Sequence, residues 1–366
     1  MELKTDLNYS AETTMMNVIR NMIPRFIFDG AQYSDIESVM QNVCDKDSWY
    51  SEWSKLGGDY EEIAKKAEDE ESLTTAKEAY LLAAICYRLS HIIIYGKSKG
   101  KIESYKREID NYTKAAKYFT GEFKRVEILC DKEKFPGYLW KPEGVDNPPC
   151  VVVLHGADST KEEYHTYNEL FINSGIAVLI IDGPGQGETM LFSHIYMDNN
   201  FERAPKAAVD FLIKSGEVDD TRIAVAGQCM GGYQALRAAS SDDRFKACFA
   251  ISPFYYLSSW TRNGIPIALR KMVEAIYNVH SEDELKELAS SISLENILQG
   301  IKCPVLIMHG DRDIFVSEHD INKIINEIKS QKEIKVYNGG YHAVLNKIKL
   351  SRAEMADWMH KMLCNK

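Results

Sequence analysis

One short stretch, Ala226–Gly232, constrains the fold of this chain more than any other; it reads Ala-Gly-Gln-Cys-Met-Gly-Gly. It follows the apolar run Arg222–Ala226 and precedes the small-residue stretch Tyr233–Ala239. A strand, a sharp turn flanked by glycines and a helix are the setting of a nucleophile elbow, whose central residue is held in a strained backbone conformation. That residue is Cys229. Taken alone, the motif is equally consistent with a glycine turn around a buried thiol.

Short apolar runs alternate with helical stretches over residues 121–366. Runs of this kind are typical of strands buried on both faces of a parallel sheet. We predict strands at Phe123–Cys130, Phe135–Lys141, Cys150–Leu154, Ala177–Ile181, Ile223–Ala226, Ala247–Ile251, Pro304–Met308 and Ile334–Tyr337. The alternation predicts an α/β fold with an eight-stranded, mostly parallel, doubly wound sheet. The segment 254–300 is longer than a simple crossover needs, and we expect it to form a small cap insertion.

Residues 1–120 show helical periodicity and predict an all-helical N-terminal cap domain. We expect a break at Gly57-Gly58 and a long helix from Ser72 to about Tyr95. On that helix Tyr87 and His91 lie on one face, where they either pack against the rest of the protein or form the roof of a substrate cavity. Both interpretations stay open on the sequence alone.

Composition and charge exclude several classes of function. The formal net charge of −10 argues against nucleic acid as a partner. No apolar run is long enough to span a membrane, and the first residues lack the apolar core of a signal peptide. The eight cysteines are scattered, without a zinc-type cluster. We therefore expect a cytoplasmic protein with no metal and no cofactor.

Three predicted strand ends carry groups suited to nucleophilic catalysis. The fifth strand leads to Cys229, the seventh to the segment His309–Val316, and the eighth to His342 in a glycine-rich loop. Strand ends of a doubly wound sheet meet at one edge, so these groups converge. The order nucleophile, acid, histidine is the order of an α/β-hydrolase.

The motifs resemble the α/β-hydrolase superfamily over residues 121–366. His155–Glu163, Asp182–Glu188 and the helical N-terminal region resemble a subgroup containing 2,6-dihydroxypseudooxynicotine hydrolase and fermentation/respiration-switch-type esterases. The resemblance implies Asp313 as the acid, backbone N–H groups of Ala157 and Met230 as the oxyanion hole, and a homodimer. Members of that subgroup carry serine where this chain carries Cys229, so the resemblance leaves the substrate class open.

The expected chemistry is a Cys229–His342–Asp313 triad acting on a small acyl (ester or thioester) or ketone substrate through an acyl-enzyme. Alternatives are carbon–carbon hydrolysis of a β-diketone, acyl transfer or cyclisation, and a non-catalytic ligand-binding protein. A redox-sensing role for Cys229 is a further alternative. The substrate-contacting residues that we predict are Asp158, Tyr87, His91, Gln228 and Tyr233.

Overall fold

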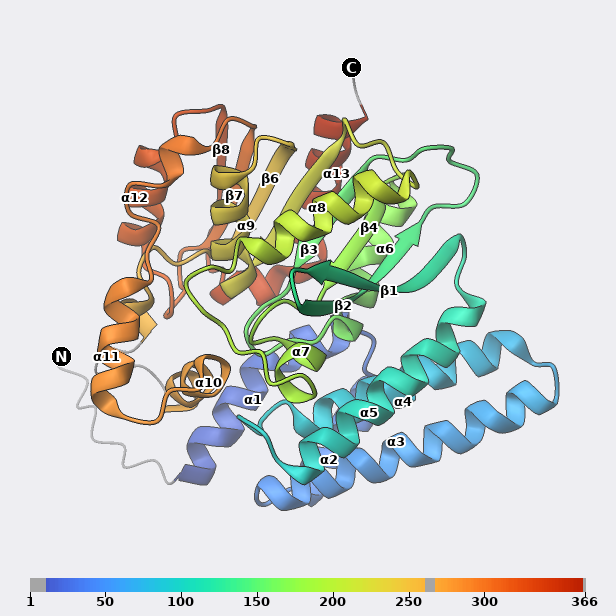
Figure 1. Ribbon diagram of the computed structural model, residues 1–366. Coiled ribbons are helices and arrows are strands. Elements are labelled where there is room, and N and C mark those ends of the chain that lie inside the picture. Colours follow the sequence, from blue (N-terminus) through green and yellow to red (C-terminus); the bar gives the residue numbers. More distant parts are fainter. Residues whose placement is uncertain (1–10, 261–266, 365–366) are drawn as a thin grey trace.

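The computed structural model describes residues 11–260 and 267–364, and one sheet runs through its centre (Figure 1). The eight-stranded sheet has the order β1-β2-β4-β3-β5-β6-β7-β8. Its strands are β1 Glu122–Cys130, β2 Glu133–Lys141, β3 Cys150–Leu154, β4 Ala177–Ile181, β5 Ile223–Gln228, β6 Phe245–Ile251, β7 Val305–Gly310 and β8 Lys332–Tyr337. Strand β2 is antiparallel to β1 and β4, and the other pairs are parallel. The predicted eight-stranded, mostly parallel sheet is confirmed.

Helices cover both faces of the sheet. One face packs against α8 (Arg203–Ser215), α9 (Met230–Ser241) and α12 (Glu318–Glu327), and the other against α6 (His165–Asn173) and α13 (Ile348–Leu363). Strands β3 and β4 are buried over their whole length because helices cover them on both sides. Burial on both faces explains their continuous apolar sequences. The loops that follow the carboxyl ends of the strands are where a site is expected in such a sheet.

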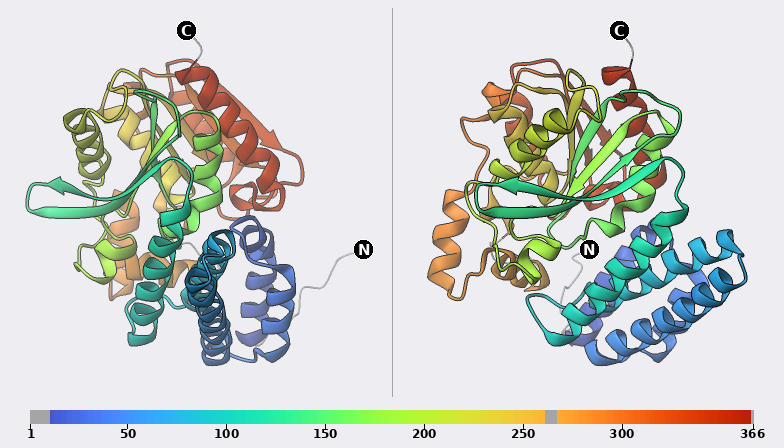
Figure 2. Two further views of the ribbon diagram at one scale, coloured as in Figure 1. Left: turned by 90° about the vertical axis from the view of Figure 1, so that its right-hand side faces the viewer. Right: turned by 45° about the vertical axis from the view of Figure 1, so that its right-hand side comes forward.

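The N-terminal region is helical, and it lies beside the core at the edge where the parallel strands end (Figures 1 and 2). Its helices are α1 Ala11–Phe28, α2 Tyr33–Asn42, α3 Lys46–Asp69, α4 Leu73–His91 and α5 Lys99–Ala115. Salt bridges from α1 and α4 reach the segment after β3, so this region adjoins the loops that follow the strands.

The expected break at Gly57-Gly58 is wrong, because α3 runs through both glycines. Gly57 is used instead for close packing between helices. A Cβ at Gly57 would stand 3.1 Å from the ring of Tyr87 on α4, whereas a Cβ at Gly58 would have more room. Tertiary contact therefore decides the conformation here, since glycine lowers intrinsic helix propensity.

The segment 254–300 contains η3 (Leu257–Trp260), α10 (Ile267–Tyr277), α11 (Glu282–Ser291) and η4 (Leu298–Gly300). A short helix, α7 (Gly187–Leu191), follows β4. Among the helices described, none is both long and apolar enough to cross a membrane. Residues 11–260 and 267–364 also hold no cluster of three or more metal-binding side chains.

Candidate active site

The turn between β5 and α9 has the geometry of a nucleophile elbow. Cys229 has φ 58° and ψ −118°, a conformation that a non-glycine residue adopts only under strain. A Cβ at Gly227 would overlap the Gly231 carbonyl, and a Cβ at Gly231 would overlap the carbonyl of Leu154 at the end of β3. The glycines therefore let α9 begin directly against β3, with Cys229 at the tip of the turn.

His342 and Asp313 form a close pair beside this turn. The Nδ1 atom of His342 lies 2.9 and 3.0 Å from the two carboxylate oxygens of Asp313. The same carboxylate accepts hydrogen bonds from the backbone N–H groups of Phe315 and Val316, at 2.9 and 3.0 Å. Burial opposes ionisation of Asp313, but His342 and these N–H groups hold its pKa below the usual value. Asp313 is therefore a fixed anion facing His342.

The His342 ring also interacts with Cys229. Burial lowers the pKa of His342, but the charges of Asp313 and Cys229 and hydrogen bonds to both outweigh it and raise the pKa well above its usual value. The rings of Trp260 and Phe315 pack edge-on against His342, with centroids 6.4 and 5.0 Å away. The structure thus brings Cys229, His342 and Asp313 together from three strand ends.

Two backbone N–H groups near Cys229 are candidates for an oxyanion hole. Met230 is the first residue of α9, so its N–H has no partner within the helix. Ala157 lies in the loop after β3, which Gly231 contacts closely. In the described part of the chain, no hydrogen bond is recorded from the backbone N–H of Ala157 or Met230. Both groups are therefore free to donate.

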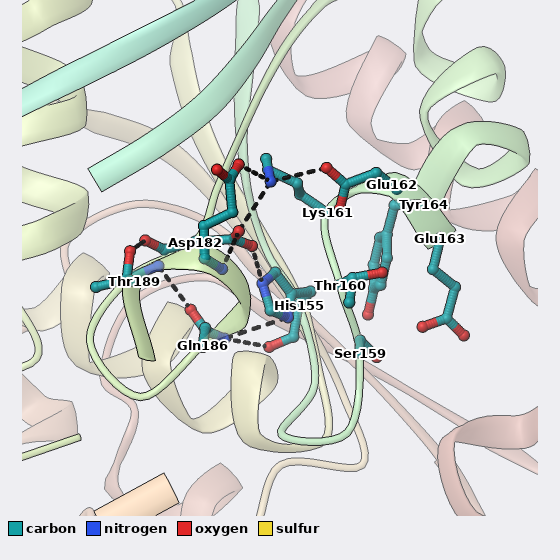
Figure 3. A network of polar contacts seen from close by, with 12 residues as sticks. His155, Ser159, Thr160, Lys161, Glu162, Glu163, Tyr164, Asp182, Gln186 and Thr189 are labelled. Atoms are coloured by element: carbon teal, nitrogen blue, oxygen red, sulfur yellow. Dashed lines mark hydrogen bonds and ion pairs between the residues drawn. The ribbon is translucent and has the colours of Figure 1, made fainter. Parts of the chain in front are cut away.

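A buried ionic network supports the loop after β3 (Figure 3). Lys161 Nζ lies 2.9 Å from Asp182 and 2.6 Å from Glu188, and it has no exposed surface. His155 Nε2 lies 3.0 Å from the other oxygen of Asp182. Gln186 donates to the carbonyl of His155 at 2.9 Å. Both ends of the loop, His155 and Lys161, are therefore attached to Asp182 at the end of β4.

The helical region holds the same loop from its other side. Arg25 on α1 bonds to Asp158 at 2.7 Å, to the Ser159 hydroxyl at 2.9 Å and to Glu163 at 2.5 Å. Arg88 on α4 bonds to Glu163 at 2.8 Å and donates to the Asp158 carbonyl. The carboxylate of Asp158, a residue predicted to contact substrate, pairs with Arg25, and the residue also borders a small pocket.

The other predicted substrate residues lie in different environments. His91 borders the same pocket as Ala157 and Asp158. Tyr87 donates to Glu61 at 3.2 Å and packs inside the helical region, as the packing interpretation expects. Tyr233 stacks on Phe254 with centroids 4.4 Å apart. The structure therefore places His91 at a cavity and leaves Tyr87 and Tyr233 in packed surroundings.

The side chain of Gln228 accepts a hydrogen bond from Arg352 on α13, a residue that the sequence analysis did not predict. The Arg352 guanidinium donates to Gln228 Oε1 at 2.8 Å and to the Ala343 carbonyl at 3.1 Å. It thus connects the residue before Cys229 with the residue after His342. Arg352 carries no local motif, so no sequence signal marked it. Lys161 and Glu163, by contrast, lie in the segment that carried the family resemblance.

A model of the FrsA-like esterase family matches residues 19–364. The chain belongs to this family. It is thus a hydrolase with the α/β-hydrolase fold, as predicted.

Individual relatives agree with this assignment. A 2,6-dihydropseudooxynicotine hydrolase of Paenarthrobacter nicotinovorans is 29% identical over 344 residues, covering 93% of this chain and 91% of that protein. The alpha/beta hydrolase gkaG of Penicillium citrinum is 32% identical over 280 residues, 69% of this chain and 65% of that protein. The crystal structure of 2,6-dihydroxy-pseudo-oxynicotine hydrolase superposes with a TM-score of 0.85 at 27% identity, covering 93% of this chain and 95% of that one.

Proposed function

We propose that this hydrolase uses Cys229 as its nucleophile in a Cys229–His342–Asp313 triad and forms a covalent acyl-enzyme. The observation that carries the proposal is the strained Cys229 at the start of α9, in contact with a His342 that Asp313 holds. A thiolate is the reactive form of cysteine, and a helix N-terminus and a neighbouring imidazolium both favour it. These surroundings support a nucleophilic role over a redox-sensing role.

The reaction then has two halves. The Cys229 sulfur attacks the substrate carbonyl carbon, and the carbonyl electron pair moves to oxygen, where the N–H groups of Ala157 and Met230 stabilise it. The adduct collapses to a thioester as the leaving group departs with a proton from His342. Water, deprotonated by His342, attacks the thioester, and the second adduct expels the Cys229 thiolate and releases the acid.

The substrate class proposed is a small ester or thioester. A thiolate is itself a good leaving group, so an adduct with a poor leaving group reverts to starting material. Carbon–carbon cleavage requires loss of a carbanion and is less well matched to a thiolate. It remains the alternative, because the subgroup that the sequence resembles includes carbon–carbon hydrolases. With an amine, alcohol or thiol in place of water, the same acyl-enzyme supports acyl transfer.

The test is intact-protein mass spectrometry after brief exposure to a panel of acyl thioesters and activated esters. We expect one acyl adduct, mapped to Cys229, that is absent in Cys229→Ala and forms more slowly in His342→Ala. Cys44→Ser is the matched control, because Cys44 is an exposed thiol outside the site and its loss should change nothing. An adduct distributed over several cysteines, or hydrolysis retained in Cys229→Ala, would contradict the proposal.

A further inference from the structure

A small pocket lies between the helical region and the loop that carries Ala157. Its wall combines polar residues of α4, α5 and their connection with residues of that loop: Arg88, His91, Tyr95, Lys101, Asp158 and Thr160. Ala157 itself belongs to the wall. Because Ala157 is a proposed oxyanion donor, a group bound in this pocket lies next to the proposed oxyanion hole.

Lys101 in this pocket forms no ion pair with a carboxylate of the described residues, and burial together with the charge of Arg88 lowers its pKa to about 8. The only hydrogen bond recorded for its ammonium group among the described residues goes to the carbonyl of Ile94, at 2.8 Å. The other charged groups of the wall are already paired: Arg88 with Glu163 at 2.8 Å, and Asp158 with Arg25 at 2.7 Å.

Glu108, which approaches the pocket from α5, does not supply the missing charge. It accepts a hydrogen bond from Thr160 at 2.5 Å and bonds to His91 Nε2 at 2.7 Å, and burial raises its pKa well above the usual value. The raised pKa of Glu108 favours its neutral acid form. A cation without a partner in a partly desolvated site favours an anion in that site.

His91 provides a second, independent indication of a ligand. His91 is 1% exposed, and among the residues that the structure describes its Nδ1 atom has no hydrogen-bond partner. Burial lowers the pKa of His91 well below its usual value, so the ring is neutral. With its proton on Nδ1, the His91 ring accepts at Nε2 from the Glu108 acid, 2.7 Å away, and presents an unpaired donor at Nδ1. Buried donors are almost always paired in native proteins, so an acceptor is expected here.

We propose that this pocket binds a negatively charged oxygen of the substrate, with Lys101 supplying the charge and His91 Nδ1 a hydrogen bond. The group is a carboxylate or an ionised enol or phenol, carried on the acyl side of the molecule. The hydroxyl of Tyr95, in the same wall, is a further donor. This inference rests on the proposed acyl chemistry and narrows its substrate to acids that bear a second, anionic group.

The test compares three aroyl thioesters that differ only at the far end of the acyl group: a carboxylate, an ionised phenol and a neutral methyl ester. For the wild type we expect kcat/KM for at least one anionic substrate to exceed that for the neutral ester by about tenfold or more. In Lys101→Met that preference should disappear through a higher KM for the anionic substrates. Lys99→Met is the control, because it removes the same charge from an exposed position two residues away.

Each outcome decides the question. A preference confined to the carboxylate or to the phenolate identifies the source of the charge. Equal rates for all three substrates, or an equal loss for all three in Lys101→Met, overturn the subsite. If the wild type turns over none of them, the acyl chemistry fails, and the subsite is then judged by calorimetry with the free arylcarboxylate and phenol. Binding to Cys229→Ala that is not weakened by adding Lys101→Met would refute it.

Discussion

Replacing Arg352 with methionine should slow the chemical step without changing substrate binding. The guanidinium connects Gln228 and Ala343, at 2.8 and 3.1 Å, and so fixes the elbow of Cys229 relative to the loop of His342. Among the described residues its hydrogen bonds go to Gln228, Ala343 and Ser351 and not to Cys229 or His342, and we regard it as a positioning residue. Methionine has a similar length and no hydrogen-bond donors, so it removes these contacts with little change in volume.

The expected fall in kcat of Arg352→Met can be estimated from the backbone strain next to His342. Ala343 and Val344 have φ of 50° and 55°, in the left-handed region. This conformation costs a non-glycine residue roughly 1–2 kcal/mol, so the two together store about 2–4 kcal/mol. Two hydrogen bonds hold Ala343 there, one from Arg352 to its carbonyl and one from its N–H to the Ser252 hydroxyl at 2.9 Å. If the two share the strain, losing one releases about 1–2 kcal/mol, which corresponds to a fall of roughly fivefold to thirtyfold in kcat.

The assay is steady-state kinetics with the best thioester, together with the rate at which a neutral haloacetamide alkylates Cys229. We expect Arg352→Met to lower kcat and the alkylation rate while KM stays constant, and Ser252→Ala to have a similar, smaller effect. Lys349→Met removes a charge from an exposed site on the same helix and should leave both rates unchanged. A kcat of Arg352→Met within twofold of wild type, at an unchanged melting temperature, would refute the reasoning.

Two further predictions concern the triad and the helical packing. Asp313 raises the pKa of His342, so the imidazolium persists above the ordinary histidine range near pH 6.5 and activity falls as pH rises through the raised value. Asp313→Asn should therefore move the alkaline limb of kcat/KM to lower pH, and an unmoved limb would exclude this charge pairing. Gly58→Ala, with 3.8 Å to the nearest atom of Tyr87, should raise stability in urea unfolding by about 0.5–1 kcal/mol. Gly57→Ala, at 3.1 Å from the Tyr87 ring, should lower stability by about 1–3 kcal/mol; equal gains at the two positions would contradict the packing.

The sheet could be predicted because each strand is a local signal. Runs such as Cys150–Leu154 and Ala177–Ile181 are apolar at every position since both faces are covered, and the structure gives β3 and β4 these same bounds. The break predicted at Gly57-Gly58 was wrong because the conformation there depends on distant residues and not on a local signal. A glycine pair lowers helix propensity locally, but whether a helix continues depends on what packs against it, and Tyr87 lies thirty residues away in sequence.

The triad residues could be brought together in advance because fold rules place strand ends at one edge. The side chains that surround the triad residues could not be placed in this way. Arg352 meets Gln228 across 124 residues of sequence, and Arg25 meets Asp158 across 133. No periodicity or motif predicts such pairs. The local sequence around an arginine on a helix is the same whether its side chain faces solvent or a buried acceptor. Only the structure therefore shows that Gln228 and Asp158 are hydrogen-bonded to arginines.

These long-range pairs bear on how the helical region serves the site. Arg25 and Arg88 hold the pKa of Glu163 well below its usual value although burial alone would raise it. Without α1 and α4, Glu163 and Asp158 would lose their arginine partners, and the loop between them would be held only through the contacts of His155 and Lys161 with Asp182. The N–H of Ala157 lies in that loop, so its direction depends on helices far from it in sequence. The helical region thus shapes the proposed oxyanion hole as well as the pocket beside it, which explains why acyl recognition and transition-state stabilisation are expected to fail together when that region is disturbed.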